Sequence, residues 1–316
     1  MSRSASGSAR PLDYVFLLRP AALVPLWVFV LYGATLAERR SGVASGSTAL
    51  PPELWLGLVA MSLILGGGYI QNQIADIETD RRNEKLFLLP RGIVTVRAAR
   101  IELAAVWGAA AVALVWLPPA FRWVAAGSVL LCATYSWAPI RAKARAPLDL
   151  LWNGLGFGAL GAAAGWTALA PVGRGLFEPA VAYVLAVAGI IASTTIPDLD
   201  GDRVAGLRTT AAVLGERRTS LVAIILLGAA AVVGWRSRDL LALWGPLLAL
   251  PLLLRAHATR RRADRVLADQ VGVVAFVAVA SFRSPWLLAL FGAALVASRC
   301  YYARRFGIAY PGPGTP

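Results

Sequence analysis

Long apolar runs constrain the fold of this 316-residue chain more than any other feature. They cover about residues 17–37, 54–75, 99–117, 120–138, 148–170, 178–197, 219–235 and 239–256, followed by a last apolar region at 268–302. Each of the eight runs has about the length that an α-helix needs to cross a bilayer, about 17–25 residues. Only helical bundles and closed barrels satisfy the backbone in lipid. Because these runs are too long for barrel strands, the sequence predicts an all-α, polytopic transmembrane helical bundle.

The helix count and the domain limits follow from the same runs. The last region is interrupted by Arg283-Ser-Pro285, so it is one long broken helix or two short spans. We therefore expect nine helices, or ten, around a central cavity. The transmembrane domain is predicted to cover residues 14–305. The polar segment 1–13 and the Pro- and Gly-rich segment 306–316 are predicted to be disordered tails.

Basic residues are unevenly divided between the two ends of the predicted helices. The net charge is +14. If the N-terminus is cytoplasmic, 21 of the 31 Lys and Arg residues fall in cytoplasmic segments, and six fall in the opposite loops: Arg39, Arg40, Arg122, Arg174, Arg236 and Arg238. This is the positive-inside pattern. It accounts for the basic charge without a nucleic-acid partner, and it predicts a multi-pass protein of a bacterial plasma membrane, in contact with membrane lipid.

Two acidic clusters lie at the predicted cytoplasmic ends of apolar runs, and together they hold six of the 17 acidic side chains. The first contains Asn72, Asp76, Glu78 and Asp80, and the second contains Asp198, Asp200 and Asp202. On an α-helix, the i, i+4, i+8 spacing of Asn72, Asp76 and Asp80 stacks them on one face, about 6 Å apart. Charge beside lipid is costly and marks a functional site. Two facing carboxylate clusters suit divalent metal ions that bridge a polyphosphate.

Several cations near these clusters are candidates for holding phosphate oxygens, which Arg and Lys bind through charge-assisted hydrogen bonds. They are Arg19 in the first run, Lys85 and Arg91 after the first cluster, Arg141 and Lys143 in a short loop, and Arg208 after the second cluster. Both acidic clusters and most of these cations are predicted on the cytoplasmic face. The sequence therefore predicts a site for an anionic, phosphate-bearing substrate at that face.

These motifs resemble those of the UbiA-type intramembrane prenyltransferases. That family pairs an Asn-x-x-x-Asp-x-x-x-Asp motif after the second helix with an Asp-x-x-x-Asp motif after the sixth. Asn72, Asp76 and Asp80 match the first motif, and Asp198 and Asp202 match the second. The stretches Leu18-Arg-Pro20, Tyr135-Ser-Trp-Ala-Pro-Ile-Arg-Ala-Lys143 and Asp198–Thr209 are also similar to family positions. The match extends from about residue 14 to 220.

The resemblance implies an enzyme with two Mg²⁺ ions held by Asp76, Asp80, Asp198 and Asp202. The metals and the basic side chains would bind the diphosphate of a polyprenyl donor and stabilise the leaving pyrophosphate. An aromatic, quinone-precursor or lipid acceptor would then attack the allylic carbocation. Tyr135 and Trp137 are candidates for stabilising that cation. The Gly-rich segment 154–161 is predicted to allow close helix packing or to leave a channel for the isoprenoid tail.

Two departures from the family pattern bear on the acceptor. After Lys85 the chain reads Leu-Phe-Leu-Leu-Pro-Arg91-Gly, where the family often has Lys-Pro-x-Arg-Pro-x-x-Ser-Gly. An apolar patch thus replaces one proline and one arginine in the segment over the site. Upstream of the second motif stand Thr194 and Thr195, where many relatives carry another acid. The acceptor, the prenyl chain length and the oligomeric state stay open.

Two other functions stay open beside prenyl transfer. A membrane terpene cyclase on the same scaffold would let a double bond of the tail attack the cation. A cation-coupled transporter also uses broken helices and intramembrane carboxylates. The position of the acids toward the helix ends, rather than at the membrane midplane, favours the enzyme.

Overall fold

The described elements are all helices. The computed structural model describes residues 8–41, 50–82 and 86–310, and within these ranges the only β-pairing is an isolated bridge between Arg145 and Arg208. The α-helices are α1 (Pro11–Leu17), α2 (Val24–Ser41), α3 (Pro52–Ala75), α4 (Ile77–Arg82), α5 (Val96–Leu114), α6 (Pro119–Ser136), α7 (Leu148–Asn153), α8 (Gly161–Leu169), α9 (Arg174–Thr194), α10 (Leu199–Val204), α11 (Thr210–Ser237), α12 (Leu240–Thr259), α13 (Arg262–Ser281) and α14 (Trp286–Phe306). Three 3₁₀ helices, η1 (Pro20–Leu23), η2 (Ala142–Ala144) and η4 (Ile196–Asp198), and one π-helix, η3 (Gly154–Leu160), lie between them. The predicted all-α class is confirmed.

Six stretches are long and apolar enough, by length and composition, to cross a membrane. They are Pro11–Arg39, Pro52–Ala75, Arg174–Val204, Thr210–Ser237, Leu240–Thr259 and Trp286–Phe306. The last apolar region divides at Ser284–Pro285 into two helices, α13 and α14. The total of nine or ten spans and the central cavity stay predictions.

The first apolar run is not one helix. α1 starts at Pro11, three residues before the predicted domain boundary, and the helix stops at Leu17. Arg19 then takes a left-handed backbone conformation (φ 54°) before Pro20, and α2 begins at Val24. Proline lacks an N–H group and disfavours helical geometry in the residue before it, so the break falls where Pro20 places it. Residues 1–7 and 311–316 of the two predicted tails lie outside the described residues.

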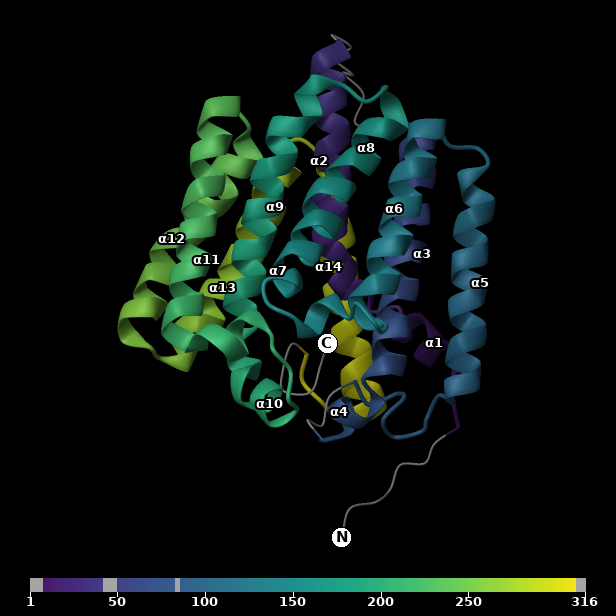
Figure 1. The fold of residues 1–316 in the computed structure, drawn as a ribbon. Coiled ribbons are helices and arrows are strands. Elements are labelled where there is room, and N and C mark those ends of the chain that lie inside the picture. The colour runs from purple at the N-terminus through teal and green to yellow at the C-terminus, as the bar shows by residue number, and fades with distance from the viewer. Residues whose placement is uncertain (1–7, 42–49, 83–85, 311–316) are drawn as a thin grey trace.

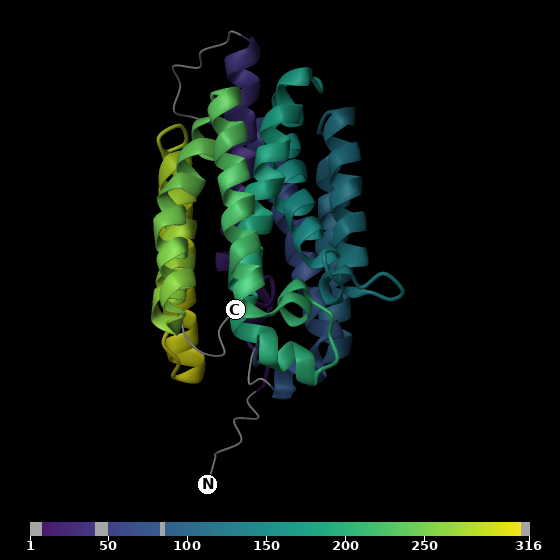
Figure 2. The same cartoon turned by 60° about the vertical axis from the view of Figure 1, so that its left-hand side comes forward.

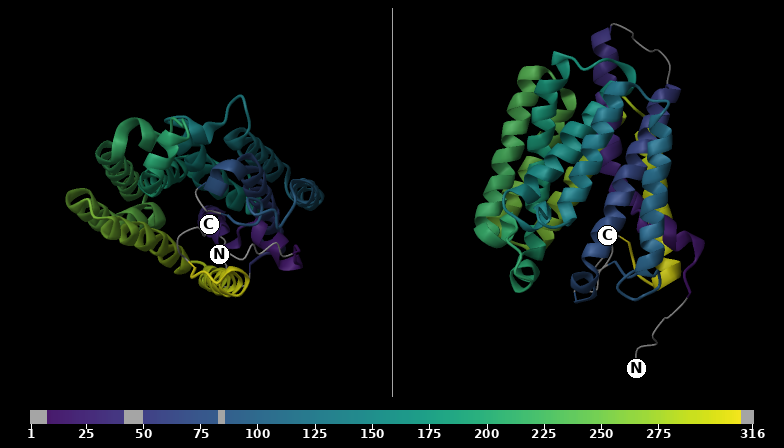
Figure 3. Two further views of the ribbon diagram at one scale, coloured as in Figure 1. Left: turned by 90° about the horizontal axis from the view of Figure 1, so that it is seen from below. Right: turned by 45° about the vertical axis from the view of Figure 1, so that its right-hand side comes forward.

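The long helices run roughly parallel to one another, and sequence neighbours pack side by side in the carboxy-terminal half, α9 with α11, α11 with α12, and α12 with α13 (Figure 1). Seen from below, the blue helices and the green helices lie on opposite sides of the bundle (Figure 3). The main core is built from apolar side chains of α2, α3, α8, α9 and α12.

Glycine allows the closest helix contacts. A Cβ at Gly165 of α8 would lie 1.7 Å from the carbonyl oxygen of Val30 in α2, and one at Gly158 would lie 2.7 Å from the backbone of Tyr183 in α9. Because lipid gives helices little hydrophobic reason to associate, small residues at such contacts supply the packing. The close packing predicted for the segment 154–161 is therefore confirmed at Gly158.

The two short helices that follow the acidic motifs lie at the same end of the bundle. α4 and α10 both stand at the lower end in Figure 1, and they remain at that end after a 60° turn (Figure 2). The fold thus brings two motifs about 120 positions apart in sequence to one end of the molecule.

Candidate active site

The first acidic motif lies at a break between α3 and α4. α3 ends at Ala75, and Asp76 adopts a non-helical backbone conformation (φ −111°, ψ 9°) before α4 begins. Asn72, Asp76 and Asp80 nevertheless keep a spacing of one helical turn across the break. The amide of Asp76 donates to the Asn72 carbonyl (3.1 Å), and the amide of Asp80 donates to the Asp76 carbonyl (2.7 Å). The predicted spacing is therefore present, although the helix is not continuous through the motif.

Lys143 joins the two leading residues of this motif. Its ammonium group donates to Asn72 Oδ1 (2.6 Å) and to Asp76 Oδ2. Ser136, at the end of α6, donates to the same Asn72 oxygen (2.9 Å). The guanidinium of Arg141 lies 3.7 Å from Asp76 Oδ1. Two of the predicted phosphate-binding cations thus contact the first acidic motif directly.

The electrostatic environment of Lys143 is set by burial and by these acids. Burial lowers the pKa of its ammonium group, and the neighbouring Asp76 carboxylate opposes that shift. Asp80, 8% exposed, is close enough to act on Lys143 as well. A buried ammonium beside carboxylates keeps its charge through them, so the cation and the acids form one coupled group.

The second motif begins at Asp198, the last residue of η4, and continues onto the short helix α10. Pro197 is in η4, where the chain changes from α9 to α10. Gly206 (φ 70°) ends α10: its amide donates to the Arg203 carbonyl, and the amide of Leu207 donates to the Asp202 carbonyl. This pair of bonds is a Schellman ending, which requires the left-handed conformation that glycine adopts easily. It turns the chain back toward α11.

Thr209 connects the second motif to α11. Its hydroxyl donates to Asp202 Oδ2 (2.8 Å), and its oxygen accepts from the amide of Ala212 (3.2 Å) as the cap of α11. The side chain of Asp198 is exposed to solvent. Asp202 is thus held in place by a neighbour, while Asp198 presents its carboxylate at the surface of this end.

Backbone bonds tie the loop of Lys143 to the segment after the second motif. The amide of Ala146 donates to the Arg208 carbonyl (2.7 Å), and the amide of Arg208 donates to the Ala144 carbonyl (3.1 Å). Beside them, buried Asp149 accepts from the amide (2.7 Å) and the hydroxyl (2.6 Å) of Thr210. These contacts hold Lys143, which binds the first motif, in a fixed relation to the chain that leaves the second.

Arg19 and Tyr135 lie near this group. The guanidinium carbon of Arg19 is 4.8 Å from the centre of the Tyr69 ring, a cation–π contact. The Tyr135 hydroxyl accepts from Asn153 Nδ2 (3.3 Å), and Arg19 and Asp76 are both close enough to act on it electrostatically. These two predicted site residues therefore border the first motif.

Three other candidates are placed differently. Arg91 is exposed, and its guanidinium stacks over the Phe87 ring at 4.1 Å, with the Phe306 ring 5.9 Å away. Trp137 is 49% exposed at the start of the loop. Lys85 lies outside the described residues. None of these three has a described contact with the acidic motifs.

The sequence interpretation assigned no role to Ser136, Asp149 or Thr209. Ser136 and Thr209 fall inside the quoted motif stretches, but a hydroxyl has no pattern of its own in such a stretch. A Thr before a helix is a capping signal, so the role of Thr209 at the start of α11 was accessible from sequence. The hydrogen bond between Asp149 and Thr210 could not be predicted from the sequence, because the two residues are 61 positions apart.

The donor set fits a hard cation. Carboxylate and amide oxygens are the ligands that Mg²⁺ prefers, and Mg²⁺ usually retains waters and takes further oxygens from substrate phosphate. Among the described residues, no group of three or more acidic, His or Cys side chains surrounds a common point. Lys143 meanwhile bridges Asn72 and Asp76 as a cation between their oxygens. The residues therefore suit metal binding that is completed by a phosphate ligand rather than by a protein cage.

Together, the apolar helices and the charged site define an integral, multi-pass membrane protein. A family model described as the UbiA prenyltransferase family matches residues 26–271, which include both acidic motifs. The chain belongs to the UbiA prenyltransferase family, and it is a prenyl-transferring enzyme. The predicted family resemblance is confirmed.

Named relatives agree with this membership. The chain is 30% identical over 215 residues to a digeranylgeranylglyceryl phosphate synthase of Natronomonas pharaonis, covering 66% of this chain and 71% of the relative. It is 29% identical over 237 residues to the bacteriochlorophyll synthase 34 kDa chain of Chloroflexus aurantiacus, covering 73% and 74%. The fold is similar to that of a UbiA homologue from Archaeoglobus fulgidus bound to GPP and Mg²⁺, with a TM-score of 0.65, 18% identity, and coverage of 89% of this chain and 99% of that one.

Proposed function

We propose that the protein transfers a prenyl group from a polyprenyl diphosphate to an aromatic, quinone-precursor or lipid acceptor in a Mg²⁺-dependent reaction that releases pyrophosphate. One observation carries the proposal. Lys143 contacts Asn72 and Asp76 of the first motif, while the loop that holds it is bonded through Ala144 and Ala146 to Arg208 beside the second. Such an arrangement suits a ligand that is both anionic and metal-binding, as a diphosphate is.

The basic side chains would act on the diphosphate. Lys143 and Arg141 next to the first motif, and Arg208 after the second, can donate to its oxygens and stabilise the charge that develops on the leaving pyrophosphate. Mg²⁺, held by Asp76, Asp80, Asp198 and Asp202, would neutralise further charge on the same group. Burial of Lys143 strengthens its interaction with an anion, because water screens it less.

The aromatic side chains suit the allylic cation and the apolar helices suit the tail. Tyr135 and Tyr69 border the first motif, and Arg19 already lies over the Tyr69 ring. A ring face that attracts a guanidinium attracts a carbocation by the same quadrupole. The Arg19 side chain, at the same place, is a further candidate for a phosphate oxygen. The isoprenoid chain would lie among the apolar helices above these groups.

The names of relatives support large acceptors. Digeranylgeranylglyceryl phosphate synthases point to a lipid alcohol that bears a phosphate, and the bacteriochlorophyll synthase chain points to a bulky pigment precursor. We favour the phosphate-bearing lipid alcohol. Lys143 and Arg141 contact the first motif, and the further cations at this end, such as Arg208, could bind the phosphate of the acceptor.

We also propose that ten helical segments cross the membrane, with the site facing the cytoplasm of a bacterial cell. α5, α6, α7 to α8, and α13 would add to the six stretches that meet the length and hydropathy limits. The Phe306 ring at the end of α14 packs against Phe87, which follows the first motif, with ring centres 5.4 Å apart. With an even number of crossings, α14 ends on the side of the membrane where α1 starts. The excess of Lys and Arg in the loops on that side indicates that it is cytoplasmic.

The test uses purified protein and labelled prenyl diphosphates from C10 to C50. We expect Mg²⁺-dependent release of pyrophosphate that requires an acceptor, together with a prenylated product found by mass spectrometry of lipid extracts. Release without any acceptor would indicate a terpene cyclase. Absence of turnover with every donor, accompanied by coupled cation uptake in liposomes, would contradict the proposal.

A further inference from the structure

A second charged site lies at the end of the bundle away from the acidic motifs. A pocket of about 270 Å³ is formed by the end of α2, the start of α9 and the turn between α11 and α12. Arg39, Arg174 and Arg238 line it, one from each segment. Because α9 starts at this pocket and leads to the second motif at its other end, the length of the bundle separates the two sites.

The concentration of arginine here is unusual for this end of the protein. Only six basic residues were assigned to this side from the sequence, and three of them line one pocket. A fourth, Arg122, is occupied elsewhere: its guanidinium donates to the carbonyls of Leu117 and Val115, both at 2.9 Å. Within the described part of the chain, the guanidinium groups of Arg39, Arg174 and Arg238 make no hydrogen bond or ion pair. They are therefore available to a ligand.

The acids of the pocket do not cancel this charge. Asp239 is 2% exposed, and its oxygens accept from the Tyr183 hydroxyl (2.5 Å) and the Ala242 amide (2.8 Å). Burial raises the pKa of the Asp239 carboxyl, and the nearby Arg39 opposes that shift. Glu178 is exposed at the rim. Three guanidinium groups against two carboxylates, of which Asp239 is buried and hydrogen-bonded, leave the pocket with a net positive charge.

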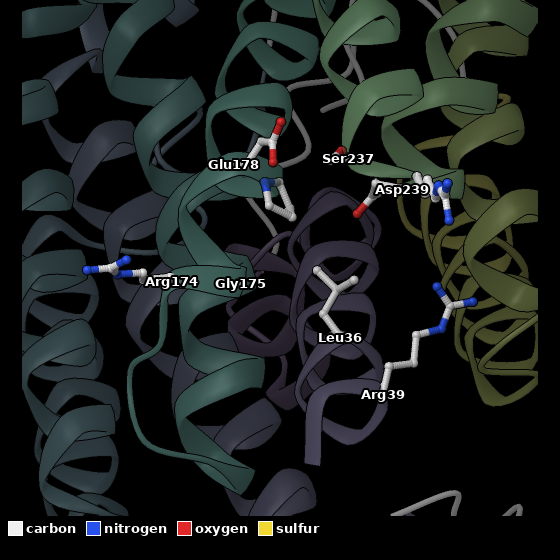
Figure 4. Close-up of a pocket in the computed structure, with 9 residues that line it drawn as sticks. Leu36, Arg39, Arg174, Gly175, Glu178, Ser237 and Asp239 are labelled. Carbon is white, nitrogen blue, oxygen red and sulfur yellow. The ribbon is translucent and has the colours of Figure 1, made fainter. Parts of the chain in front are cut away.

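The orientation of the side chains indicates which of the three arginines could bind one ligand together. Figure 4 shows Arg39 extending from the end of α2 toward the turn that carries Asp239, while Arg174 points away from them. Arg238 precedes Asp239 in that turn, in a left-handed conformation (φ 54°). Arg39 and Arg238 both line the pocket on the side of this turn, whereas Arg174 points away from it.

We propose that this pocket binds a phosphate group through Arg39 and Arg238. Guanidinium groups pair with phosphate oxygens through two parallel hydrogen bonds, which a lysine cannot do. The volume lies just below the range of about 300–1,000 Å³ for drug-sized ligands, so the pocket has room for a headgroup rather than a whole lipid. The phosphate belongs to an anionic lipid headgroup or to a small soluble phosphate, because a guanidinium group recognises the phosphate oxygens of either.

The test measures binding to the full-length protein in detergent by native mass spectrometry. The probes are phosphatidylglycerol, diacylglycerol with the same acyl chains, glycerol phosphate and inorganic phosphate. The variant Arg39→Gln/Arg238→Gln removes both cations, and Arg236→Gln is the matched control, because Arg236 is exposed in the same region but does not line the pocket. The probe lacking phosphate is compared on the unaltered protein, so this arm does not depend on the folding of a variant.

We expect phosphatidylglycerol to bind the protein and the control variant, with affinity about tenfold or more weaker in the double variant, and diacylglycerol not to be retained. Competition by soluble phosphates at equal concentration would assign the pocket to a free phosphate, and its absence would assign it to the lipid. Equal retention of phosphatidylglycerol by the double variant, or of diacylglycerol by the unaltered protein, would overturn the proposal. Prenyl transfer by the double variant should remain unchanged, so this test is independent of the proposed reaction.

Discussion

The two acidic motifs share the Asp-x-x-x-Asp spacing but are held in different ways. In the first, Asp76 is 18% exposed at its side chain and is contacted by Lys143 and Arg141. In the second, Asp198 is exposed, and Asp202 accepts a hydrogen bond from the Thr209 hydroxyl. The first motif is therefore contacted by two cations at Asp76, whereas the second begins in η4 and continues onto the six-residue helix α10.

This difference suggests separate tasks for the two motifs. Lys143 keeps the first in a charge-balanced state before any ligand arrives, so a metal ion must compete with an ammonium group for Asp76. In the second motif, the Asp198 side chain is exposed to solvent. We infer that metal binding at the first motif depends on displacement of Lys143 from Asp76. Substitutions in each motif test these separate tasks.

Removal of a motif carboxylate should have the largest effect. We expect Asp76→Ala and Asp202→Ala each to lower turnover by about 100-fold or more, as loss of one preorganised charge-stabilising group does. Pyrophosphate release from a labelled donor measures this. Glu78→Ala is the control for the first motif, since Glu78 pairs only with Arg81 and Arg82 among the described residues, and Asp200→Ala is the control for the second. Near-normal turnover in Asp76→Ala or Asp202→Ala would remove that motif from the site.

Replacement of Lys143 should separate phosphate binding from metal binding. Lys143→Met removes a buried charge-assisted donor, so the KM for the prenyl donor should rise about tenfold or more. The same change frees Asp76 from its competitor, so half-maximal activity should need less Mg²⁺. Titrations of donor and of metal provide the two readouts, and Lys143→Arg is the control that keeps the charge. A higher Mg²⁺ requirement in Lys143→Met would show that the ammonium does not compete for Asp76.

Loss of the Thr209 hydroxyl should have a smaller effect that appears mainly in stability. Thr209→Val removes the cap of α11 and the bond to Asp202, and a lost cap costs about 1 kcal/mol. We expect a lower unfolding temperature and a severalfold fall in turnover. Thr209→Ser retains the oxygen and should behave like the unaltered protein. If Thr209→Val were equally stable but inactive, Thr209 would contact the substrate rather than support Asp202.

The smallest effect is expected at Arg91. Its guanidinium stacks on Phe87 and approaches Phe306, away from the described contacts of either motif. Arg91→Gln should change the donor KM by less than about threefold, with a stability cost of about 0.5–1 kcal/mol for the lost cation–π contact. The same substitution at Arg208 should weaken donor binding more strongly. A reversed order would mean that the segment after Lys85 folds over the site when substrate is bound.

Much of the fold followed from the length of the apolar runs, because each run produced a helix or a pair of helices, although α11 begins nine residues before its predicted run and α13 begins six residues before. The positions at which helices are interrupted were harder to predict. Pro20 is a visible signal, but the sequence analysis predicted neither the π-helix at Gly154–Leu160 nor the interruption of α11 at Gly215 (φ 77°).

The site was predictable where the chemistry depends on spacing. The two Asp-x-x-x-Asp motifs needed only their positions. The sequence could not show which cations contact the acidic motifs, because Lys143 and Arg91 appeared equivalent as basic residues in basic loops. Lys143 reaches Asp76 because its loop folds back onto Arg208 through backbone hydrogen bonds of Ala144 and Ala146, and backbone bonds leave no trace in side-chain patterns.

The most direct measurement is the binding of a non-reactive prenyl thiodiphosphate to purified protein, with and without Mg²⁺, in the unaltered chain and in Asp76→Ala and Asp202→Ala. We predict binding that requires Mg²⁺ and that falls by about tenfold or more in both variants, because one ligand touches both motifs. Binding that is unchanged by Mg²⁺, or that survives intact in either variant, would contradict the account.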